Sequence, residues 1–280
     1  MKKYILGVCL LGTGLALQAQ TVASCCSRAA TESFAMLSAD EDFRRSHEDP
    51  LPFRYEGEQG KWVDIDVKDG AKARIYEIKN SDVATARTVL LFHEWWGIND
   101  YILRESDRIF NTLGNVNLVA VDLYDGQVAS DKETAGKLMG ELKTERATAI
   151  VNAVYGYIGK KQKVATIGWC MGGGWSLQAA ILGGKQVDAC VMYYGFPEKD
   201  VARLKTLHAK VMLVYPDMDK WITQQVVDEF KANMAGAKKS LQVETYHADH
   251  AFANPSNPHY EKEMAEDAYG KAMAFIKANW

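Results

Sequence analysis

Hydrophobic positions along this chain fall into two alternating patterns. Short, continuous apolar runs bounded by turn residues are typical of strands buried on both faces of a sheet. Longer segments with apolar residues every three or four positions predict amphipathic helices that cover such a sheet. The expected strands are 63–67, 73–78, 89–92, 118–121, 164–167, 189–193, 211–215 and 241–246, and the expected helices are 101–113, 132–158, 172–182, 223–235 and 260–278.

This alternation of strands and helices predicts an α/β fold. Its central sheet should be mostly parallel and covered by helices on both faces. The first two strands form a hairpin-like pair with a turn at Asp69-Gly70. Later crossovers should be right-handed. The segments that follow Val121 and Tyr194 are short, so we expect little or no lid domain.

The N-terminus has the layout of a secretory signal peptide. Lys2 and Lys3 give it a positive start, an uncharged apolar run covers residues 5–17, and polar residues follow. The run is too short to span a bilayer. We therefore predict a signal peptide over residues 1–20 and an exported protein, periplasmic or secreted.

Residues 21–55 are polar and mixed, and we interpret them as an N-terminal arm that leads into a domain over residues 56–280. Within the arm, residues 22–25 resemble a bacterial lipobox that ends at Cys25. The alternative prediction is therefore a lipoprotein anchored at Cys25, and a membrane partner is expected only in that case.

Composition narrows the classes of function. Of 280 residues, 48% are hydrophobic and 25% are charged, and the net charge of -3 gives no indication of a nucleic-acid partner. The five cysteines show neither a disulfide framework nor the spacing of a zinc site. Cys190 lies in an apolar strand and is expected in the core.

The segment around Cys170 resembles a nucleophile elbow. The strand at 164–167 runs directly into a Gly-x-Cys-x-Gly turn and then a helix. Gly168 and Gly172 should lack side chains because strand and helix pass close to the turn. The helix N-terminus favours a thiolate, and the backbone N–H of Met171 should contribute to an oxyanion hole. The alternative is a glycine-rich turn with an inert cysteine. Such a turn could bind phosphate, although the chain lacks the Lys-Ser/Thr of a phosphate-binding loop.

A hydrolase with such an elbow carries its acid and then its base after the nucleophile. The loop after strand 241–246 contains His247 and His250, and we favour His250 as the base. The acid should follow strand 211–215, where Asp217 and Asp219 are both candidates. Position alone does not separate them, and either could cap the following helix instead.

The loop after strand 89–92 is expected to supply the other wall of the oxyanion hole. Trp95 is the expected backbone donor. Burial at the end of this strand should raise the pKa of Glu94, so that its carboxylate could take the thiol proton. The alternative is a surface glutamate beside two packed tryptophans.

Three separated motifs resemble the dienelactone hydrolase family: His93-Glu94-Trp95-Trp96-Gly97, Gly168-Trp169-Cys170-Met171-Gly172-Gly173 and His250-Ala251-Phe252. The similarity runs from about Tyr55 to the C-terminus. The loop 217–222 also resembles the acid loop of the family and favours Asp219, with Pro216 in place of a glycine.

The resemblance implies an α/β-hydrolase fold and hydrolysis of a small-molecule lactone or activated ester through an acyl-enzyme. The implied triad is Cys170, His250 and Asp219, with Glu94 controlling the thiol and no cofactor. Members that bind an anionic substrate use arginines, whereas the fourth position after the base is Asn254 and segment 122–126 has no arginine. Two alternative hypotheses are a general exported esterase or acyltransferase, and a non-catalytic ligand-binding protein with the hydrolase fold.

Overall fold

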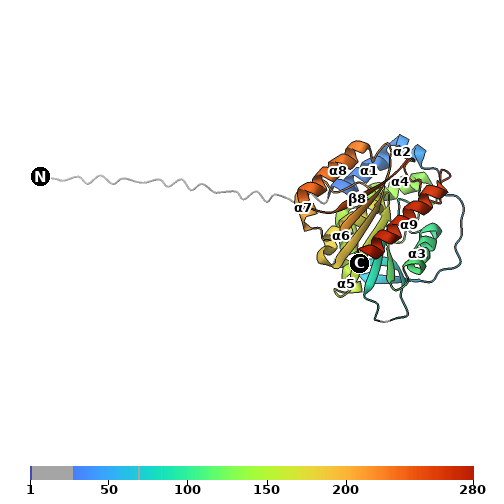
Figure 1. Cartoon of the computed structure of the whole chain (residues 1–280), viewed down its shortest axis with the longest axis horizontal. Coiled ribbons are helices and arrows are strands. Elements are labelled where there is room, and N and C mark those ends of the chain that lie inside the picture. Colours follow the sequence, from blue (N-terminus) through green and yellow to red (C-terminus); the bar gives the residue numbers. More distant parts are fainter. Residues whose placement is uncertain (2–27, 69, 83) are drawn as a thin grey trace.

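The computed structural model describes residues 1, 28–68, 70–82 and 84–280, and its centre is an eight-stranded sheet (Figure 1). The strand order is β1-β2-β4-β3-β5-β6-β7-β8. The pairs β1–β2 and β2–β4 are antiparallel, and all the other neighbours are parallel. The strands are β1 (Lys61–Asp66), β2 (Lys72–Ile78), β3 (Arg87–Phe92), β4 (Asn117–Val121), β5 (Lys163–Trp169), β6 (Val187–Tyr193), β7 (Lys210–Pro216) and β8 (Leu241–Tyr246).

Helices cover both faces of this sheet. On one face α3 and α9 contact each other, and on the other α5 and α6 pack together (Figure 1). The predicted α/β class with a mostly parallel sheet is therefore confirmed. The helices are α1 (Arg28–Ala39), α2 (Glu41–Ser46), α3 (Asp100–Leu113), α4 (Lys132–Glu141), α5 (Thr144–Ile158), α6 (Met171–Gly183), α7 (Val201–Thr206), α8 (Gln224–Ala237) and α9 (Lys262–Ala278), with a short 3-10 turn at Gly184–Gln186.

The single long helix predicted over 132–158 is wrong, because the chain turns between α4 and α5. Leu142 has extended backbone angles (φ −60°, ψ 118°), and its side chain is buried in the core. The extended backbone of Leu142 ends α4, and the sequence has no proline there that would predict this end. The short helix α7 was also not predicted.

The N-terminal arm packs onto the domain through α1 and α2. Helix α1 lies against α4, where a Cβ at Gly140 would come within 2.7 Å of the Ser38 hydroxyl. Phe34 and Phe43 are almost completely buried. The predicted signal peptide and Cys25 lie outside the described residues. Among the described residues, no helix is both long and apolar enough to cross a membrane.

Strand β3 is the point where the strand order reverses, since it pairs with β4 on one side and with β5 on the other. In open parallel sheets, ligands bind beyond the carboxyl ends of the strands at such a point. The loops that follow β3 and β5 carry the residues from 93 onwards and from 170 onwards. The topology therefore brings together the two motifs with the strongest chemical signal.

Candidate active site

Cys170 occupies a strained turn between β5 and α6. Its φ of 53° lies in the left-handed region, which residues with a side chain rarely adopt. Its backbone N–H donates to the carbonyl of Tyr193 at 3.0 Å, and its carbonyl accepts from Gly173 at 2.9 Å. These bonds hold the turn and place the buried thiol at the N-terminus of α6.

Two glycines permit this geometry. A Cβ at Gly168 would lie 2.1 Å from the carbonyl oxygen of Gly172. A Cβ at Gly172 would lie 2.3 Å from the carbonyl oxygens of both Phe92 and His93. Because these obstacles are backbone atoms, no side-chain rotation can remove them. The close approach expected from the Gly-x-Cys-x-Gly spacing is present.

His250 and Asp219 form a buried pair. Nδ1 of His250 lies 2.6 Å from Oδ2 of Asp219, and their side chains are 3% and 0% exposed. The other carboxylate oxygen of Asp219 accepts the backbone N–H groups of Trp221 and Ile222 at 2.8 and 2.9 Å. One ring nitrogen of His250 lies within 4.8 Å of the Sγ of Cys170. Residues that are far apart in the chain thus meet at the turn.

A second Asp–His pair lies in the same two loops but faces solvent. Nδ1 of His247 is 2.9 Å from Oδ1 of Asp217, and the side chains are 81% and 39% exposed. The sequence did not separate Asp217 from Asp219 by position. Burial separates them, because only the His250–Asp219 pair lies beside the thiol.

The buried thiol, imidazole and carboxylate perturb one another. Burial raises the pKa of Cys170 above its usual value, and this outweighs the lowering by His250 and by the Met171 N–H. Burial lowers the pKa of His250, but the charges of Asp219 and of ionised Cys170 raise it by more, to well above its usual value. Burial thus favours the protonated form of the Cys170 thiol, whereas the charge of Asp219 favours the imidazolium form of His250.

Glu94 is buried beside the same thiol. Its carboxylate accepts a hydrogen bond from the Tyr194 hydroxyl at 3.2 Å and another from the Asn254 amide. Burial raises the pKa of Glu94 to about 7, against smaller lowering by His250 and by these two hydrogen bonds. Glu94 is therefore buried and its pKa is raised, as expected from the sequence. The alternative of a surface glutamate is wrong.

The raised pKa of Glu94 has a consequence for stability. The unfolded chain ionises this carboxyl near pH 4.5, whereas the folded chain does so near 7, so the folded state loses stability as pH rises between these values. We expect Glu94→Gln to remove this loss. Its free energy of unfolding, relative to the wild type, should rise between pH 4.5 and 7 by about 3 kcal/mol and then stay level.

Urea denaturation at pH 5 and pH 8 measures this difference. The exposed Glu56→Gln serves as the control and should show no such pH dependence. A Glu94→Gln difference of equal size at both pH values would contradict the raised pKa.

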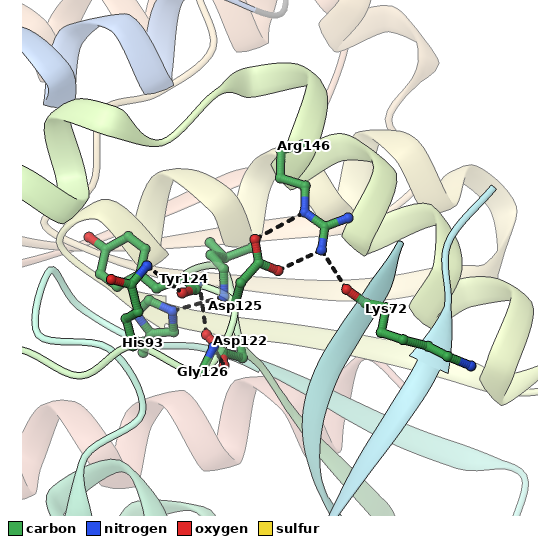
Figure 2. A network of polar contacts seen from close by, with 9 residues as sticks. Lys72, His93, Asp122, Tyr124, Asp125, Gly126 and Arg146 are labelled. Carbon is green, nitrogen blue, oxygen red and sulfur yellow. Dashed lines mark hydrogen bonds and ion pairs between the residues drawn. The ribbon is translucent and has the colours of Figure 1, made fainter. Parts of the chain in front are cut away.

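The loop after β3 is held beside the elbow by a buried histidine (Figure 2). Nδ1–H of His93 donates to the Glu94 carbonyl at 2.5 Å, and Nε2 accepts the backbone N–H of Leu123 at 3.1 Å. The Tyr124 ring packs against His93, and its hydroxyl points to the sulfur of Met171 at 3.4 Å. These contacts connect the loops that follow β3 and β4 to the first residue of α6.

The loop after β4 has further supports in the same network (Figure 2). Asp122 accepts the backbone N–H of Gly126 at 2.6 Å, which closes a tight turn around Asp125 (φ 53°). Arg146 of α5 donates to Asp125 at 2.5 Å and to the Lys72 carbonyl at 2.6 Å. Contacts with β2 and α5 therefore stabilise the loop after β4.

The two predicted oxyanion donors come from different elements, Met171 from the start of α6 and Trp95 from the loop after β3. The backbone N–H of Met171 lowers the pKa of the Cys170 thiol and so favours its charged form, although burial outweighs this effect. Trp95 is fully buried in the loop after β3, and its ring packs edge-on against Trp96 and Phe43. The structure thus brings Trp95 to the site, and its role as a donor stays a prediction.

His47 from the N-terminal arm is part of the site, and the sequence analysis missed it. Its ring is 4.8 Å from the ring of Trp95 and 5.3 Å from that of His250. Phe43 and Trp221 flank the same ring. Burial, and secondly the charge of His250, lower the pKa of His47 to about 3, so the ring is neutral at physiological pH. Its position in a short polar segment gave no periodic signal.

A cavity of about 590 Å³ adjoins the site between α3 and α9. Glu94, Trp169 and Asn254 form its inner wall, whereas Cys170 and His250 do not line it. Arg104 of α3 lies on the outer wall and stacks over Phe53 at 4.6 Å. The sequence analysis found no arginine in the loops near the base, because this one comes from a helix that precedes the elbow. The cavity gives the site room for a small organic molecule.

Comparison with known proteins identifies the family. The model of the "Dienelactone hydrolase family" matches residues 72–279. "Protein usf" of Aquifex pyrophilus is 26% identical over 234 residues, which cover 78% of this chain and 98% of that protein. "Carboxymethylenebutenolidase" of Pseudomonas sp. (strain P51) is 30% identical over 119 residues, which cover 41% of this chain and 47% of that protein.

Solved structures share the fold. The structure named "m3DLH" superposes with a TM-score of 0.67 at 21% identity and covers 79% of this chain and 99% of its own. A Pyrococcus furiosus esterase gives a TM-score of 0.57 at 15% identity, over 82% of this chain and 98% of its own. The sheet topology and these neighbours together show the α/β-hydrolase fold. Because the family match spans residues 72–279, which include Glu94, Cys170 and His250, this chain belongs to the dienelactone hydrolase family and is a hydrolase of lactones or carboxylic esters.

Proposed function

We propose that the chain hydrolyses its ester or lactone through a covalent thioester on Cys170, with His250 and Asp219 as its partners. The observation that carries this proposal is the buried Asp219–His250 pair, which directs one end of the imidazole toward Asp219 and leaves the other close to the thiol. An imidazole held by a carboxylate keeps one tautomer and one orientation.

In the first half-reaction, Glu94 takes the proton of the Cys170 thiol, and the sulfur attacks the carbonyl carbon. Two observations support these roles. Burial keeps the Cys170 thiol protonated, and the pKa of Glu94 is raised to about 7, so this carboxylate can accept the thiol proton. The new S–C bond forms, and the C–O bond to the leaving group then breaks. His250, protonated in the resting site, donates its proton to the leaving oxygen.

In the second half-reaction, neutral His250 takes a proton from water, and the resulting hydroxide attacks the thioester. The C–S bond breaks, the carboxylic acid leaves, and the thiolate recovers its proton from Glu94. The N–H groups of Met171 and Trp95 would hold the oxyanion in both steps.

The adjoining cavity supports a small substrate with an apolar body. Trp96, Trp169 and Tyr193 contribute aromatic surface to its lining. Arg104 adds a cation on the outer wall, whereas Arg108 is engaged by Glu105 and Glu266. A substrate panel should therefore include neutral aryl esters, neutral lactones and carboxylate-bearing lactones.

Intact-mass measurement after mixing with an activated aryl ester tests the proposed thioester. We expect a burst of phenol release and a transient mass increase equal to the acyl group, located on Cys170 by peptide mapping. Cys170→Ala should show neither. Cys190, which is buried in β6, provides the internal control because it should stay unmodified. Turnover without burst or adduct, or an adduct elsewhere, would contradict the thioester.

We further propose that the protein is exported, with its mature N-terminus near residue 20 or at a lipidated Cys25. The apolar run at 5–17 behind two lysines supports export, and the lipobox-like segment at 22–25 supports the alternative. The mass of the mature N-terminal peptide distinguishes these two cases from an unprocessed chain.

A further inference from the structure

His47 is held as a buried ring with one free nitrogen. Its Nδ1 lies 2.8 Å from the Phe43 carbonyl oxygen, so this nitrogen carries the hydrogen and donates it. The residue is 4% exposed, and Nε2 makes no hydrogen bond to any described group. A helix-ending role for His47 needs only Nδ1. It therefore leaves unexplained why an acceptor nitrogen is buried without a partner.

His250 has a similar arrangement, and its ring lies 5.3 Å from that of His47. Its Nδ1 is bound to Asp219, and its Nε2 also has no hydrogen-bond partner among the described residues. One nitrogen of each ring and the Sγ of Cys170 all lie within 4.8 Å of one another. Two free imidazole nitrogens and a sulfur thus converge on one buried point.

The hydrogen bonds of these two histidines are those that metal-binding histidines usually make. A ligating imidazole usually donates its other N–H to a backbone carbonyl or a carboxylate, which fixes the ring and increases its basicity. His47 has the Phe43 carbonyl in this place, and His250 has Asp219. Two imidazoles and one thiolate form a donor set typical of Zn²⁺.

We propose that His47, Cys170 and His250 form a three-ligand site for a thiophilic divalent cation such as Zn²⁺. A cation bound at this site stops hydrolysis. The cation replaces the thiol proton of Cys170 and the Nε2 proton of the His250 imidazolium, and both protons are released to solvent as the bonds to sulfur and nitrogen form. The fourth tetrahedral position is left for water. The binding part of this proposal stands by itself, and the inhibition part rests on the proposed role of Cys170.

The site needs only a small closing movement. Tetrahedral Zn²⁺ at its usual bond lengths sets its donor atoms roughly 3.3–3.6 Å apart. The present separations of up to 4.8 Å therefore require shifts of about 1 Å shared among three side chains. Hard cations such as Mg²⁺ prefer oxygen ligands and should not compete.

The test uses the full chain with Co²⁺ as a spectroscopic probe and Zn²⁺ as the inhibitor. We expect one Co²⁺ per chain and a thiolate-to-cobalt charge-transfer absorption that Cys170→Ser abolishes. Aryl-ester hydrolysis should fall as Zn²⁺ occupies the site and recover on chelation, while Mg²⁺ has no effect.

The contribution of His47 is measured with two variants, His47→Gln and His47→Phe, each compared with its own metal-free rate. Both should weaken Zn²⁺ inhibition and Co²⁺ binding by roughly 100-fold, since the loss of one supporting group around a metal already costs about 10–100-fold. The solvent-exposed His247→Gln is the matched control and should bind like the wild type. Circular dichroism confirms that each variant is folded.

Equal Zn²⁺ and Co²⁺ affinities in the wild type and in either folded His47 variant would overturn the proposal. So would a wild-type Co²⁺ complex without thiolate absorption. If the chain has no esterase activity, the Co²⁺ spectrum still tests the binding site, so failure of the proposed function and failure of the metal site are separate results.

Discussion

Asp219→Asn is expected to lower kcat about 10⁴-fold, whereas Asp217→Asn leaves it unchanged within about twofold. The two residues share one loop, and each bonds the Nδ1 of a histidine. In Asp219→Asn, the amide oxygen can still accept the N–H groups of Trp221 and Ile222, which leaves the amide nitrogen facing His250. An amide donor there forces the hydrogen of His250 onto Nε2, the nitrogen that must accept a proton from water.

Steady-state kinetics on an aryl ester measure both variants, with Cys170→Ala as the reference without a nucleophile. The exposed pair gives a further control, because His247→Gln should match Asp217→Asn while His250→Gln should match Asp219→Asn. Similar losses for Asp217→Asn and Asp219→Asn would show that burial does not identify the acid, and the proposed triad would then be wrong.

Gly172→Ala should destabilise the fold by about 4 kcal/mol or more, which is at the upper end of the effects of single substitutions. The added Cβ would lie 2.3 Å from two backbone oxygens at the end of β3. Relief requires α6 to move away from the sheet, and this movement also displaces the Cys170 turn. We therefore expect a lower urea midpoint together with loss of activity.

Gly156→Ala is the matched control for this substitution, since it adds the same methyl group to a helix. Gly156 is exposed on α5, and no atom lies within 4 Å of its virtual Cβ. There the higher helix propensity of alanine should stabilise the protein by up to about 1 kcal/mol. If Gly172→Ala unfolded at the same urea concentration as the wild type, the close packing of the elbow would be disproved.

The parts of the site that could be predicted are those fixed by local sequence. A strand that runs into Gly168, Cys170 and Gly172 defines the elbow, since few other residues fit so close a turn. The strand order of this fold then predicts which later loop holds the base. The choice between Asp217 and Asp219 was beyond position alone, because the two differ in burial, and burial depends on the packing of the whole molecule.

His47 and Arg104 could not be predicted for a related reason. Neither belongs to a motif, and each reaches the site through the packing of a helix far from Cys170 in the sequence. The turn at Leu142 is a similar case, because a buried leucine looks the same in a continuous helix as at its end. The positions of His47 and Arg104 and the turn at Leu142 all depend on tertiary contacts. A periodic sequence pattern indicates only which side of an element is apolar.

The docking of the arm has a consequence for how the protein is made. Phe43 leaves the ribosome well before Trp221 and His250, whose rings pack against it in the folded protein. The segment synthesised first therefore completes its packing last, and its aromatic side chains have no native partner in a nascent chain. During this interval the exposed aromatic rings of the arm make an incomplete chain more prone to aggregate.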